Sequence, residues 1–318
     1  MSFSSDLKGE LSRVMTDKKQ EQLAEIAGFL RVSASMRLAG GGNFTIVCNT
    51  ESPAIARHYK KLIKSYFGST VRLSVGESMG PGKSNENRYI LTVSPEEKSQ
   101  QILRETGLLL IREGYDYLSD GIYPEVVRSK GSKRAYLRGI FLGCGTMSDP
   151  RKGYHLEFAL TSEQTAQDLR KLIGSFVDLS AKVSQRNKQY VVYMKKADYI
   201  SDMLALMGAG GAMMDFENIR IYRGQRGTAQ RHDNCDYANM DRTLTAAQEQ
   251  LAWIRAVDAK YGLENLPPEL REVARVRMEQ PEASLAEIGE ALNPPIKKPG
   301  VSKRFARLRD LAASEEQR

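Results

Sequence analysis

The sequence predicts an α+β fold: a duplicated domain over residues 1–223, then an all-α helix-turn-helix domain over residues 242–318. The first observation is a repeat, because residues 61–66 (KLIKSY) return as residues 171–176 (KLIGSF), a shift of 110 positions (171 minus 61). Such a shift indicates a duplicated subdomain, since solenoid repeats have periods of about 20–50 residues. The second observation is that both copies show the same order of helix and strand patterns, which we interpret as αββαββα-like halves. The third is that only helical patterns follow residue 242.

The first half of the duplication covers about residues 20–112, after a short amphipathic helix over residues 4–15. Apolar residues three and four apart predict its helices, and alternation with β-branched residues predicts its strands. The predicted elements are a helix over 21–36, a strand over 43–48, a helix over 53–66, hairpin strands over 70–75 and 88–93, and a helix over 100–111.

A connector containing Gly and Pro, residues 119–132, leads to the second half at about residues 133–222. Its predicted elements are a helix over 134–143, a strand over 154–160, a helix over 163–177, hairpin strands over 182–185 and 190–195, and a helix over 200–207. Two copies of one unit can pack with pseudo-two-fold symmetry. That symmetry suits a partner that is itself nearly two-fold, such as duplex DNA.

The character of the sequence changes after residue 223. Residues 224–241 are polar and lack apolar periodicity, which we interpret as an extended linker. The helical domain then begins with a long helix that carries the one tryptophan, Trp253. Ser284 and Glu287 form a capping-box pattern at the start of a short helix. The predicted helices of this domain cover 242–261, 268–280, 285–292 and 301–313, with a turn over 293–300.

The last two helices fit a helix-turn-helix. At about 100° per residue, the apolar side chains of the last helix fall on one face: Val301, Phe305, Leu308 and Ala312. Small and basic residues fall on the other: Ser302, Lys303, Ala306 and Arg307, flanked by Arg304 and Arg309. A face of this kind suits entry into the major groove, and flanking arginines suit phosphates.

Positive charge is concentrated on this element. Residues 297–309 hold six basic and no acidic residues, whereas residues 241–318 as a whole hold 13 of each. An ordinary solvated helix of a three-helix bundle is the alternative, and the concentrated charge favours DNA binding. The predicted DNA-binding residues are Ser284, Lys297, Lys298, Ser302, Lys303, Arg304, Arg307 and Arg309.

The composition agrees with an anionic partner inside the cell. The 318 residues include 47 Lys plus Arg against 39 Asp plus Glu, a net charge of +8. The three cysteines are scattered and odd in number, which favours a reducing compartment over a disulfide framework. We see neither the apolar core of a secretory signal nor a run near the roughly 20 residues that span a bilayer. We therefore expect a cytoplasmic protein without a membrane partner.

Two short motifs fail as chemical sites. Residues 79–84 (MGPGKS) lack the first glycine of a phosphate-binding loop, because Glu77 stands where that glycine is needed. Residues 232–236 (HDNCD) hold one His and one Cys without a second cluster at metal-ligand spacing. His58 and His155 have no partnered carboxylate or nucleophile pattern. We therefore predict no metal, no cofactor and no small-molecule substrate.

The helices that open the two halves resemble the signature helices of LAGLIDADG homing endonucleases. The matching segments are residues 26–34 (IAGFLRVSA) and 137–145 (LRGIFLGCG), in which Gly28 and Gly139 would let the helices approach closely. The resemblance implies a saddle-shaped domain in which each helix ends in an acidic residue that holds the catalytic metal. Ser33 and Cys144 stand at those positions here, and neither is the carboxylate that Mg²⁺ favours.

A degenerate domain of this kind joined to a helix-turn-helix resembles the WhiA family of bacterial regulators over the whole chain. The most specific matches are residues 234–239 (NCDYAN), 266–270 (LPPEL), 285–289 (LAEIG) and 300–301 (GV). The last domain is also similar to the last DNA-binding region of sigma factors. One departure is that residues 297–299 are KKP where the family usually has SKS.

The resemblance implies a sequence-specific, nucleoid-associated DNA-binding regulator without catalytic activity. Its implied roles are cell division, chromosome segregation and, where the organism sporulates, sporulation. Double-stranded DNA is the expected partner, with RNA polymerase or another regulator as a candidate protein partner. The alternative is a metal-dependent nuclease or RNA-processing enzyme on the same saddle, and Ser33 and Cys144 argue against it.

The saddle itself carries basic hairpins over residues 70–93 and 182–195. Their cations are Arg72, Lys83 and Arg88 in the first half and Lys182, Arg186 and Lys188 in the second. They predict a weak, sequence-independent DNA contact that falls steeply with salt. A solvated basic hairpin, with the saddle serving protein partners instead, remains open at this point.

Overall fold

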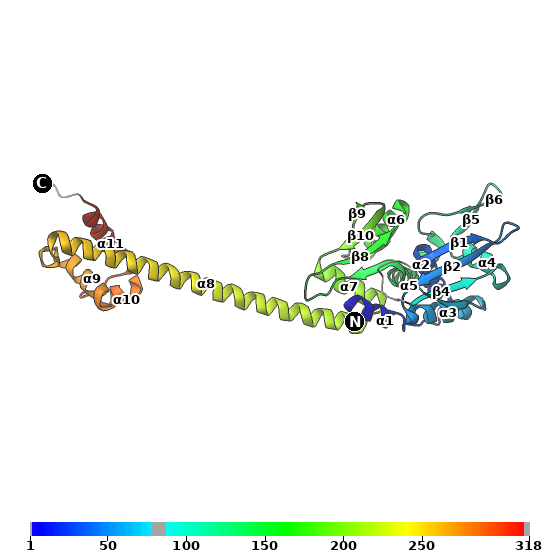
Figure 1. Ribbon diagram of the computed structural model, residues 1–318, viewed down its shortest axis with the longest axis horizontal. Coiled ribbons are helices and arrows are strands. Elements are labelled where there is room, and N and C mark those ends of the chain that lie inside the picture. Colours follow the sequence, from blue (N-terminus) through cyan, green and yellow to red (C-terminus); the bar gives the residue numbers. More distant parts are fainter. Residues whose placement is uncertain (1, 78–86, 315–318) are drawn as a thin grey trace. The chain divides into compact units, whose positions relative to one another are not determined.

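The computed structural model describes residues 2–77 and 87–314 and divides the chain into two compact units, Met1–Arg223 and Gly224–Arg318. Figure 1 labels many of the helices and strands of both. The glycine-containing segment 79–84 and Lys83 lie outside the described residues.

The first half of the first unit is built around one helix and a four-stranded antiparallel sheet of order β1-β2-β4-β3. The helix α3 begins after Ser52, whose Oγ accepts a hydrogen bond from Ile55 N at 3.4 Å, and its first residue is a proline. The elements are α2 (Lys19–Ser33), β1 (Ala34–Leu38), β2 (Phe44–Thr50), α3 (Pro53–Phe67), β3 (Arg72–Glu77), β4 (Asn87–Val93), η1 (Pro95–Glu97) and α4 (Ser99–Glu105).

The second half repeats this plan and confirms the predicted duplication. Its sheet has the order β7-β8-β10-β9, the same connectivity as the first. Ser162 caps α6 as Ser52 caps α3, with its Oγ 3.1 Å from Thr165 N. The elements are α5 (Lys130–Cys144), β7 (Gly145–Met147), β8 (Leu156–Leu160), α6 (Glu163–Gly174), β9 (Lys182–Arg186), β10 (Gln189–Met194) and α7 (Ala197–Met207).

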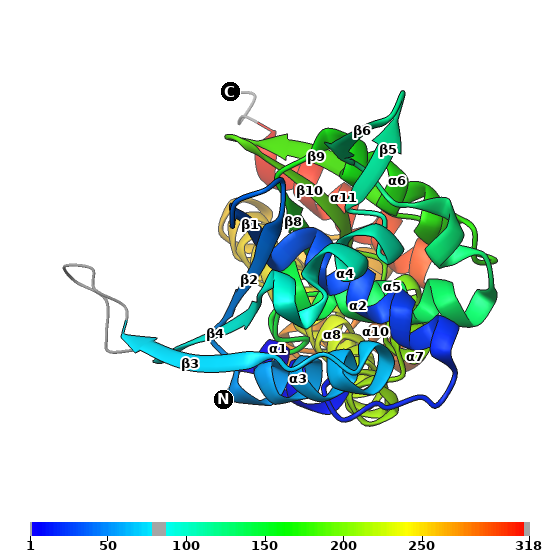
Figure 2. The same cartoon turned by 90° about the vertical axis from the view of Figure 1, so that its right-hand side faces the viewer.

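The two halves meet along α2 and α5, which lie side by side at the centre of the unit (Figure 2). Gly28 and Gly139 stand at the contact, as predicted. A Cβ at Gly28 would lie 2.4 Å from the Tyr136 carbonyl oxygen, and one at Gly139 would lie 2.2 Å from the Glu25 carbonyl oxygen. The backbones therefore touch where any larger side chain would force the helices apart.

Several short strands were not predicted. The expected helix over 21–36 ends at Ser33, and Ala34–Leu38 forms β1. The expected helix over 100–111 ends at Glu105, and a hairpin follows, β5 (Leu109–Arg112) and β6 (Tyr115–Leu118). Gly107 has a positive φ of 71°, which ends helical geometry there. The strand β7 was also missed, because three residues are too few to show alternation.

Two short helices, one at each end of the first half, complete the first unit. Helix α1 (Phe3–Leu11) buries Leu7 and Leu11 in the core, and η2 (Pro124–Val127) lies in the predicted connector. Glu10 of α1 accepts hydrogen bonds from the backbone N–H groups of Gly211 and Ala212, both at 2.8 Å. That carboxylate caps the first turn of α8, where a helix favours negative charge.

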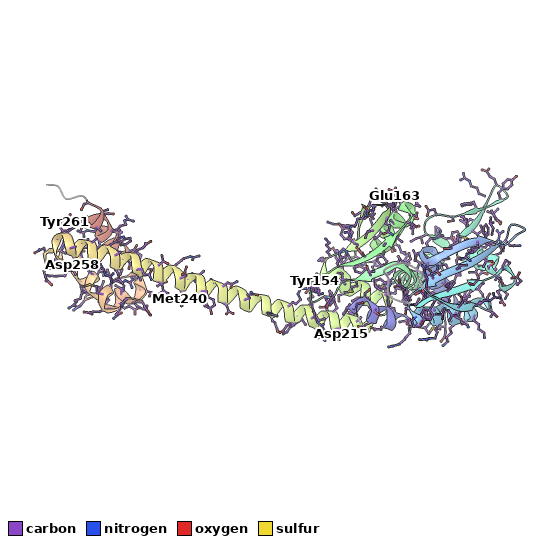
Figure 3. All side chains as sticks on the ribbon, viewed as in Figure 1. Tyr154, Glu163, Asp215, Met240, Asp258 and Tyr261 are labelled. Carbon is purple, nitrogen blue, oxygen red and sulfur yellow. The ribbon has the colours of Figure 1, made fainter. Side chains whose placement is uncertain are left out.

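The prediction of an extended linker over residues 224–241 is wrong. These residues belong to one long helix, α8 (Gly210–Tyr261). The segment has no proline, and its lack of apolar periodicity reflects a helix with no core to face, not the absence of a helix. Residues 233–242 are all exposed, and Figure 3 shows side chains around Met240 standing out from α8 on all sides.

The second unit packs the end of α8 against three shorter helices around its own apolar core. Its elements are η3 (Leu263–Asn265), α9 (Pro268–Glu279), α10 (Leu285–Ala291) and α11 (Lys298–Ala313). The predicted helix-turn-helix pair is thus α10 and α11. The core residues are Ile254, Val257, Leu266, Leu270, Val273, Ala274, Val276, Ile288, Leu292, Val301, Phe305 and Leu308. Within the described residues, no helix is long and apolar enough to cross a membrane.

Candidate nucleic-acid interface

The first helix of the pair is capped as the sequence predicts. Ser284 Oγ accepts a hydrogen bond from Glu287 N at 3.3 Å, and Glu287 Oε2 accepts one from Ser284 N at 2.7 Å. These hydrogen bonds lower the pKa of Glu287. Ser284, one of the predicted DNA-binding residues, therefore has its hydroxyl engaged in the cap, which places the start of α10.

The turn between the helices is drawn tightly onto α10. Ile296 N donates to the Gly289 carbonyl at 2.9 Å, and a Cβ at Gly289 would lie 2.2 Å from the Ile296 carbonyl oxygen. Helix α11 begins at Lys298, three residues earlier than predicted. Pro299 fits the first turn of a helix, so the KKPG segment starts α11 and does not belong to the turn.

The two faces of α11 are as the helical wheel predicts. Val301, Phe305 and Leu308 are buried, and Ala312 is partly buried against the same core. On the opposite side Ser302, Lys303 and Arg307 are exposed, while Ala306 is half-buried.

The arginines of α11 are held by acidic partners. Arg304 is largely covered, and its guanidinium lies 3.9 Å from a Glu269 carboxylate oxygen and 3.8 Å from one of Glu272, both on α9. Arg307 lies 3.9 Å from the other oxygen of Glu269. Arg309 pairs with its neighbour Asp310 at 3.2 Å. Glu269 thus draws two of the predicted DNA-binding arginines toward α9, an arrangement that the helical wheel does not capture.

The lysines at the start of α11 are arranged differently. Lys297, Lys298 and Lys303 are exposed, and among the described residues none of them has an ion pair within 4.0 Å. Lys297 is the N-cap residue and Lys298 the first helical residue. The first turn of a helix carries free N–H groups and a positive dipole end, so these ammonium groups add to a site that already favours anions.

A buried arginine that the sequence analysis missed positions α11. Arg277 of α9 donates to Gln250 Oε1 through Nε at 3.0 Å and through a terminal nitrogen at 2.8 Å, and to the Pro281 carbonyl at 3.2 Å. Its guanidinium lies 5.6 Å from the Phe305 ring centre, and burial lowers the pKa of Arg277. Arg277 therefore links α8, α9 and the segment before α10 to the buried face of α11. A lone arginine on an amphipathic helix gave no signal of this role.

In the first unit, Ser33 and Cys144, which stand where the resemblance implies metal-holding acids, each lie at the end of a central helix. Ser33 is the last residue of α2, and its Oγ donates to the Phe29 carbonyl at 2.5 Å. Cys144 is the last residue of α5, and burial raises the pKa of its thiol to about 12, although the Lys8 ammonium opposes this. Neither group is an anionic oxygen at neutral pH. Asp149, the next carboxylate after Cys144 in the sequence, lies in the loop after β7, where it accepts a hydrogen bond from Arg151 N at 2.9 Å.

The predicted basic hairpins lie on one face of the two sheets. Strand register places Arg72, Arg88, Lys182 and Arg186 opposite to the core residues, and Arg37 of the unpredicted strand β1 joins them. We call the face that carries these five residues the saddle face. Within the part of the chain that the structure describes, Arg186 is the member of this face that forms an ion pair, 3.5 Å from Glu157 Oε2. His155 also contacts Glu157 at 2.7 Å, and Lys188 is exposed in the β9–β10 turn.

A buried charged network joins the two halves. Glu25 of α2 lies 2.7 Å from His58 Nε2 and 2.6 Å from an Arg138 guanidinium nitrogen, and Arg138 also donates to the Met207 carbonyl at 3.1 Å. Burial raises the pKa of Glu25, but hydrogen bonds from His58 and Arg138 outweigh it, and the net shift is downward. His58, to which the sequence assigned no chemistry, thus holds a structural anion. No group of three His, Cys, Asp or Glu residues suited to a metal occurs within the described side chains, which leave out His232.

Comparison with known proteins agrees with this arrangement. The family model of the WhiA N-terminal LAGLIDADG-like domain matches residues 19–109, that of the WhiA LAGLIDADG-like domain matches 133–226, and that of the WhiA C-terminal HTH domain matches 229–312. A "Probable cell division protein WhiA" of Thermoanaerobacter pseudethanolicus is 37% identical over 100% of this chain and 99% of its own length. One of Clostridium perfringens is 39% identical over 98% of each chain.

Solved structures give the same result. The crystal structure of full-length DUF199/WhiA from Thermatoga maritima matches with a TM-score of 0.60 and 27% identity, covering 98% of both chains. That of the N-terminal LAGLIDADG domain of DUF199/WhiA matches with a TM-score of 0.50 and 25% identity, covering 65% of this chain and 92% of that one. With two LAGLIDADG-like halves, a C-terminal helix-turn-helix and relatives that match along its whole length, the chain belongs to the WhiA family.

Proposed function

We propose that this chain is a sequence-specific DNA-binding regulator without catalytic activity, acting in cell division. The observation that carries the proposal is the basic start of α11. Lys297, Lys298 and Lys303 are exposed there without ion pairs among the described residues, on a helix whose opposite face buries Val301, Phe305 and Leu308. A rigid helix with unpaired cations at its N-terminal turn suits the major groove of DNA. The role in cell division follows the names of the relatives.

The proposed contacts fall into two classes. Ser302, Lys303 and Arg307 are directed to base edges, while Lys297, Lys298, Arg304 and Arg309 are directed to phosphates. Ser284 contributes by fixing the start of α10. Arg304 and Arg307 must release Glu269 to reach DNA. The pair of Arg307 with Glu269 is exposed, and such pairs contribute about 0–1 kcal/mol, so a base contact can replace it. Arg304 is more covered, but its distance of 3.9 Å from the partly exposed Glu269 is long, so a phosphate contact can replace that pair too.

The lack of catalysis belongs to the proposal. A nuclease or an RNA-processing enzyme on this saddle would need carboxylates where Ser33 and Cys144 stand. The Ser33 hydroxyl is bonded within its own helix, and the Cys144 thiol stays protonated at neutral pH because its pKa is about 12. Neither residue can hold Mg²⁺ as a carboxylate would.

We further propose that the chain acts in the cytoplasm at the nucleoid. Chromosome segregation and sporulation are extensions of the same regulatory role, and RNA polymerase or another regulator is the proposed protein partner. The saddle face is proposed to add a weak contact to DNA. Its cations support a sequence-independent contribution, because electrostatic attraction to phosphates needs no base readout.

The proposal is tested by mapping the sites bound in the genome at a stated salt concentration and then titrating variants on one verified site. Lys298→Ala should weaken matched and scrambled duplexes alike and flatten the plot of log affinity against log salt by about 0.9. Arg307→Ala should instead reduce discrimination between the two duplexes by about 1–3 kcal/mol. Arg255→Ala, which removes an exposed cation from α8, is the matched control. The assignment is wrong if Lys298→Ala and Arg307→Ala change both duplexes in the same way.

A further inference from the structure

The two halves of the first unit carry hollows at equivalent places, next to the ends of α5 and α2. The first-half hollow is lined by residues of α1, α2, α5 and the first sheet, among them Ser4, Lys8, Asn49, Glu51, Arg88 and Leu142. The second-half hollow is lined by Arg31 and Thr161 among others. Glu51 of one corresponds to Thr161 of the other by the 110-residue shift. Leu142 of the first corresponds in the same way to Arg31 of the second (142 minus 31 is 111).

The second-half hollow is closed by the chain itself. Arg31 donates to the carbonyls of Ser119 and, at 2.9 Å, Gly107, both in segments that precede the second half. The space that remains is about 120 Å³. The one cation of this hollow is therefore already used by backbone oxygens.

The first-half hollow is open and polar. Leu142 stands where Arg31 stands in the other half, and a space of about 530 Å³ remains. Helix α1 brings a cation from outside the repeat, Lys8, and is held in place by Ser4, whose Oγ accepts a hydrogen bond from Met147 N at 3.2 Å. Serine and threonine hydroxyls line the same space.

The Lys8 ammonium lacks an adequate counter-charge. It lies 6.0 Å from the Phe141 ring centre, and burial lowers its pKa although the Glu51 carboxylate acts in the opposite direction. Within the described residues no carboxylate oxygen lies within 4.0 Å of Lys8. A partly desolvated cation in a polar hollow is stabilised by an anion that enters the hollow.

The hollow also reaches the saddle face. Arg88 and Asn49 both line it, and strand register places both side chains on the side of the first sheet away from the core. An extended polyanion lying on that face would bring anionic groups to the mouth of the hollow. DNA has phosphates at regular spacing along its backbone, so it can place one there while others contact Arg37 and Arg72.

We propose that the first-half hollow binds one backbone phosphate of DNA, with Lys8 and Arg88 as its cations and hydroxyls of α1 and the β2–α3 turn as hydrogen-bond donors. The inference rests on the proposed contact of the saddle face with DNA. It makes that contact asymmetric, because Arg31 closes the second-half hollow. Helix α1, which lies outside the repeat, thereby becomes part of the nucleic-acid interface.

The test is a salt titration of the full chain on one duplex. Lys8→Met keeps an apolar stem against Phe141 and removes the charge, so the salt slope should fall by about 0.9, with affinity reduced about tenfold at 50 mM salt and about threefold at 200 mM. Lys8→Arg should retain the slope. The matched control is Lys61→Met, an exposed lysine of α3, which packs on the core side of the same sheet and should leave the slope unchanged.

Two further experiments distinguish a wrong assignment of the hollow from a wrong assignment of the saddle face. The double variant Arg72→Gln with Lys182→Gln tests the saddle face itself. If it flattens the slope while Lys8→Met does not, the hollow is wrongly assigned and the saddle contact stands. If neither flattens the slope, the saddle contact fails as well. In the third arm, inorganic phosphate is titrated against thermal unfolding. If phosphate stabilises the wild-type chain but not Lys8→Met, and the DNA slope is unchanged, the hollow is a site for small anions and the DNA assignment is overturned.

Discussion

At the scale of single residues, the cations of this protein differ in burial: two buried arginines bond other groups of the chain, whereas exposed lysines of α11 are among those that we propose to contact DNA. Arg138 and Arg277 are buried and satisfy carboxylate, amide and backbone oxygens. Lys297, Lys298 and Lys303 are exposed at the start of α11. Long aliphatic stems allow either placement, so residue type alone does not separate a structural cation from one that binds a ligand.

The Glu25 network gives a prediction at this scale. Glu25→Gln should lower the free energy of unfolding of the first unit by about 3–5 kcal/mol, because it leaves the buried Arg138 without its counter-charge. Urea unfolding followed by far-UV circular dichroism measures the loss. The fluorescence of Trp253, the one tryptophan, reports the second unit and should not change. Glu157→Gln, which removes a partly exposed partner of His155, is the control and should have a much smaller effect.

The same network predicts an acid dependence of known sign. The folded-state pKa of Glu25 is depressed, so the ionised network stabilises the fold fully above the ordinary carboxyl pKa of about 4.3. This stability is lost as the pH falls through the folded-state pKa, since the unfolded chain then binds more protons. In Glu25→Gln this part of the acid dependence should be absent. If Glu25→Gln and the unsubstituted chain showed the same dependence of the unfolding free energy on pH between pH 3 and pH 6, the assignment of this acid dependence to Glu25 would be contradicted.

At the scale of elements, close packing of backbones decides where the functional helices lie. Gly28 and Gly139 allow α2 and α5 to touch, and Gly289 draws the turn before α11 onto α10. Each of these glycines allows the contact because it has no side chain where two backbone segments lie close together. The capping serines act through hydrogen bonds, and Ser52, Ser162 and Ser284 each start a helix in this way.

Gly139→Ala tests the packing of the central helices. The new Cβ would lie 2.2 Å from the Glu25 carbonyl oxygen and 3.0 Å from Phe29 N, so α2 and α5 must separate. We expect the midpoint of unfolding of the first unit to fall, at a cost of about 1–3 kcal/mol or more. Gly174→Ala, at the last residue of α6, is the control, because its added Cβ meets no atom of another segment within 4 Å and the substitution should cost little stability. Equal effects of the two substitutions would argue against close packing at Gly139.

At the scale of the molecule, the LAGLIDADG-like unit has Ser33 and Cys144 where the resemblance to homing endonucleases implies metal-holding acids, so we propose that the chain does not cut DNA. Supercoiled plasmid that carries a verified site should therefore remain intact with the full chain and Mg²⁺ or Mn²⁺, as gel electrophoresis would show. Ser33 and Cys144 offer a bonded hydroxyl and a protonated thiol in place of the acids. Metal-dependent cutting that Ser33→Ala or Cys144→Ala abolishes would overturn this expectation.

Much of this protein follows from its sequence alone, because the determining signals are local. The 110-residue repeat predicts two equivalent halves, and Gly28 with Gly139 predicts their contact. The spacing of Val301, Phe305 and Leu308 predicts the buried face of α11. Periodicity and capping are properties of neighbouring residues, and a repeat is visible by comparing the sequence with itself, so all three can be recognised before the chain folds.

Only the tertiary structure decided the rest. Strand β1 exists because it pairs with β2, and residues 224–241 are helical although they have no core to face. Glu269 reaches Arg304 and Arg307 from another helix, and Glu25 finds Arg138 at a separation of 113 positions along the chain. The open hollow beside Lys8 arises from the meeting of α1, α5 and the first sheet. These features depend on contacts between distant segments, whose partners no local pattern specifies.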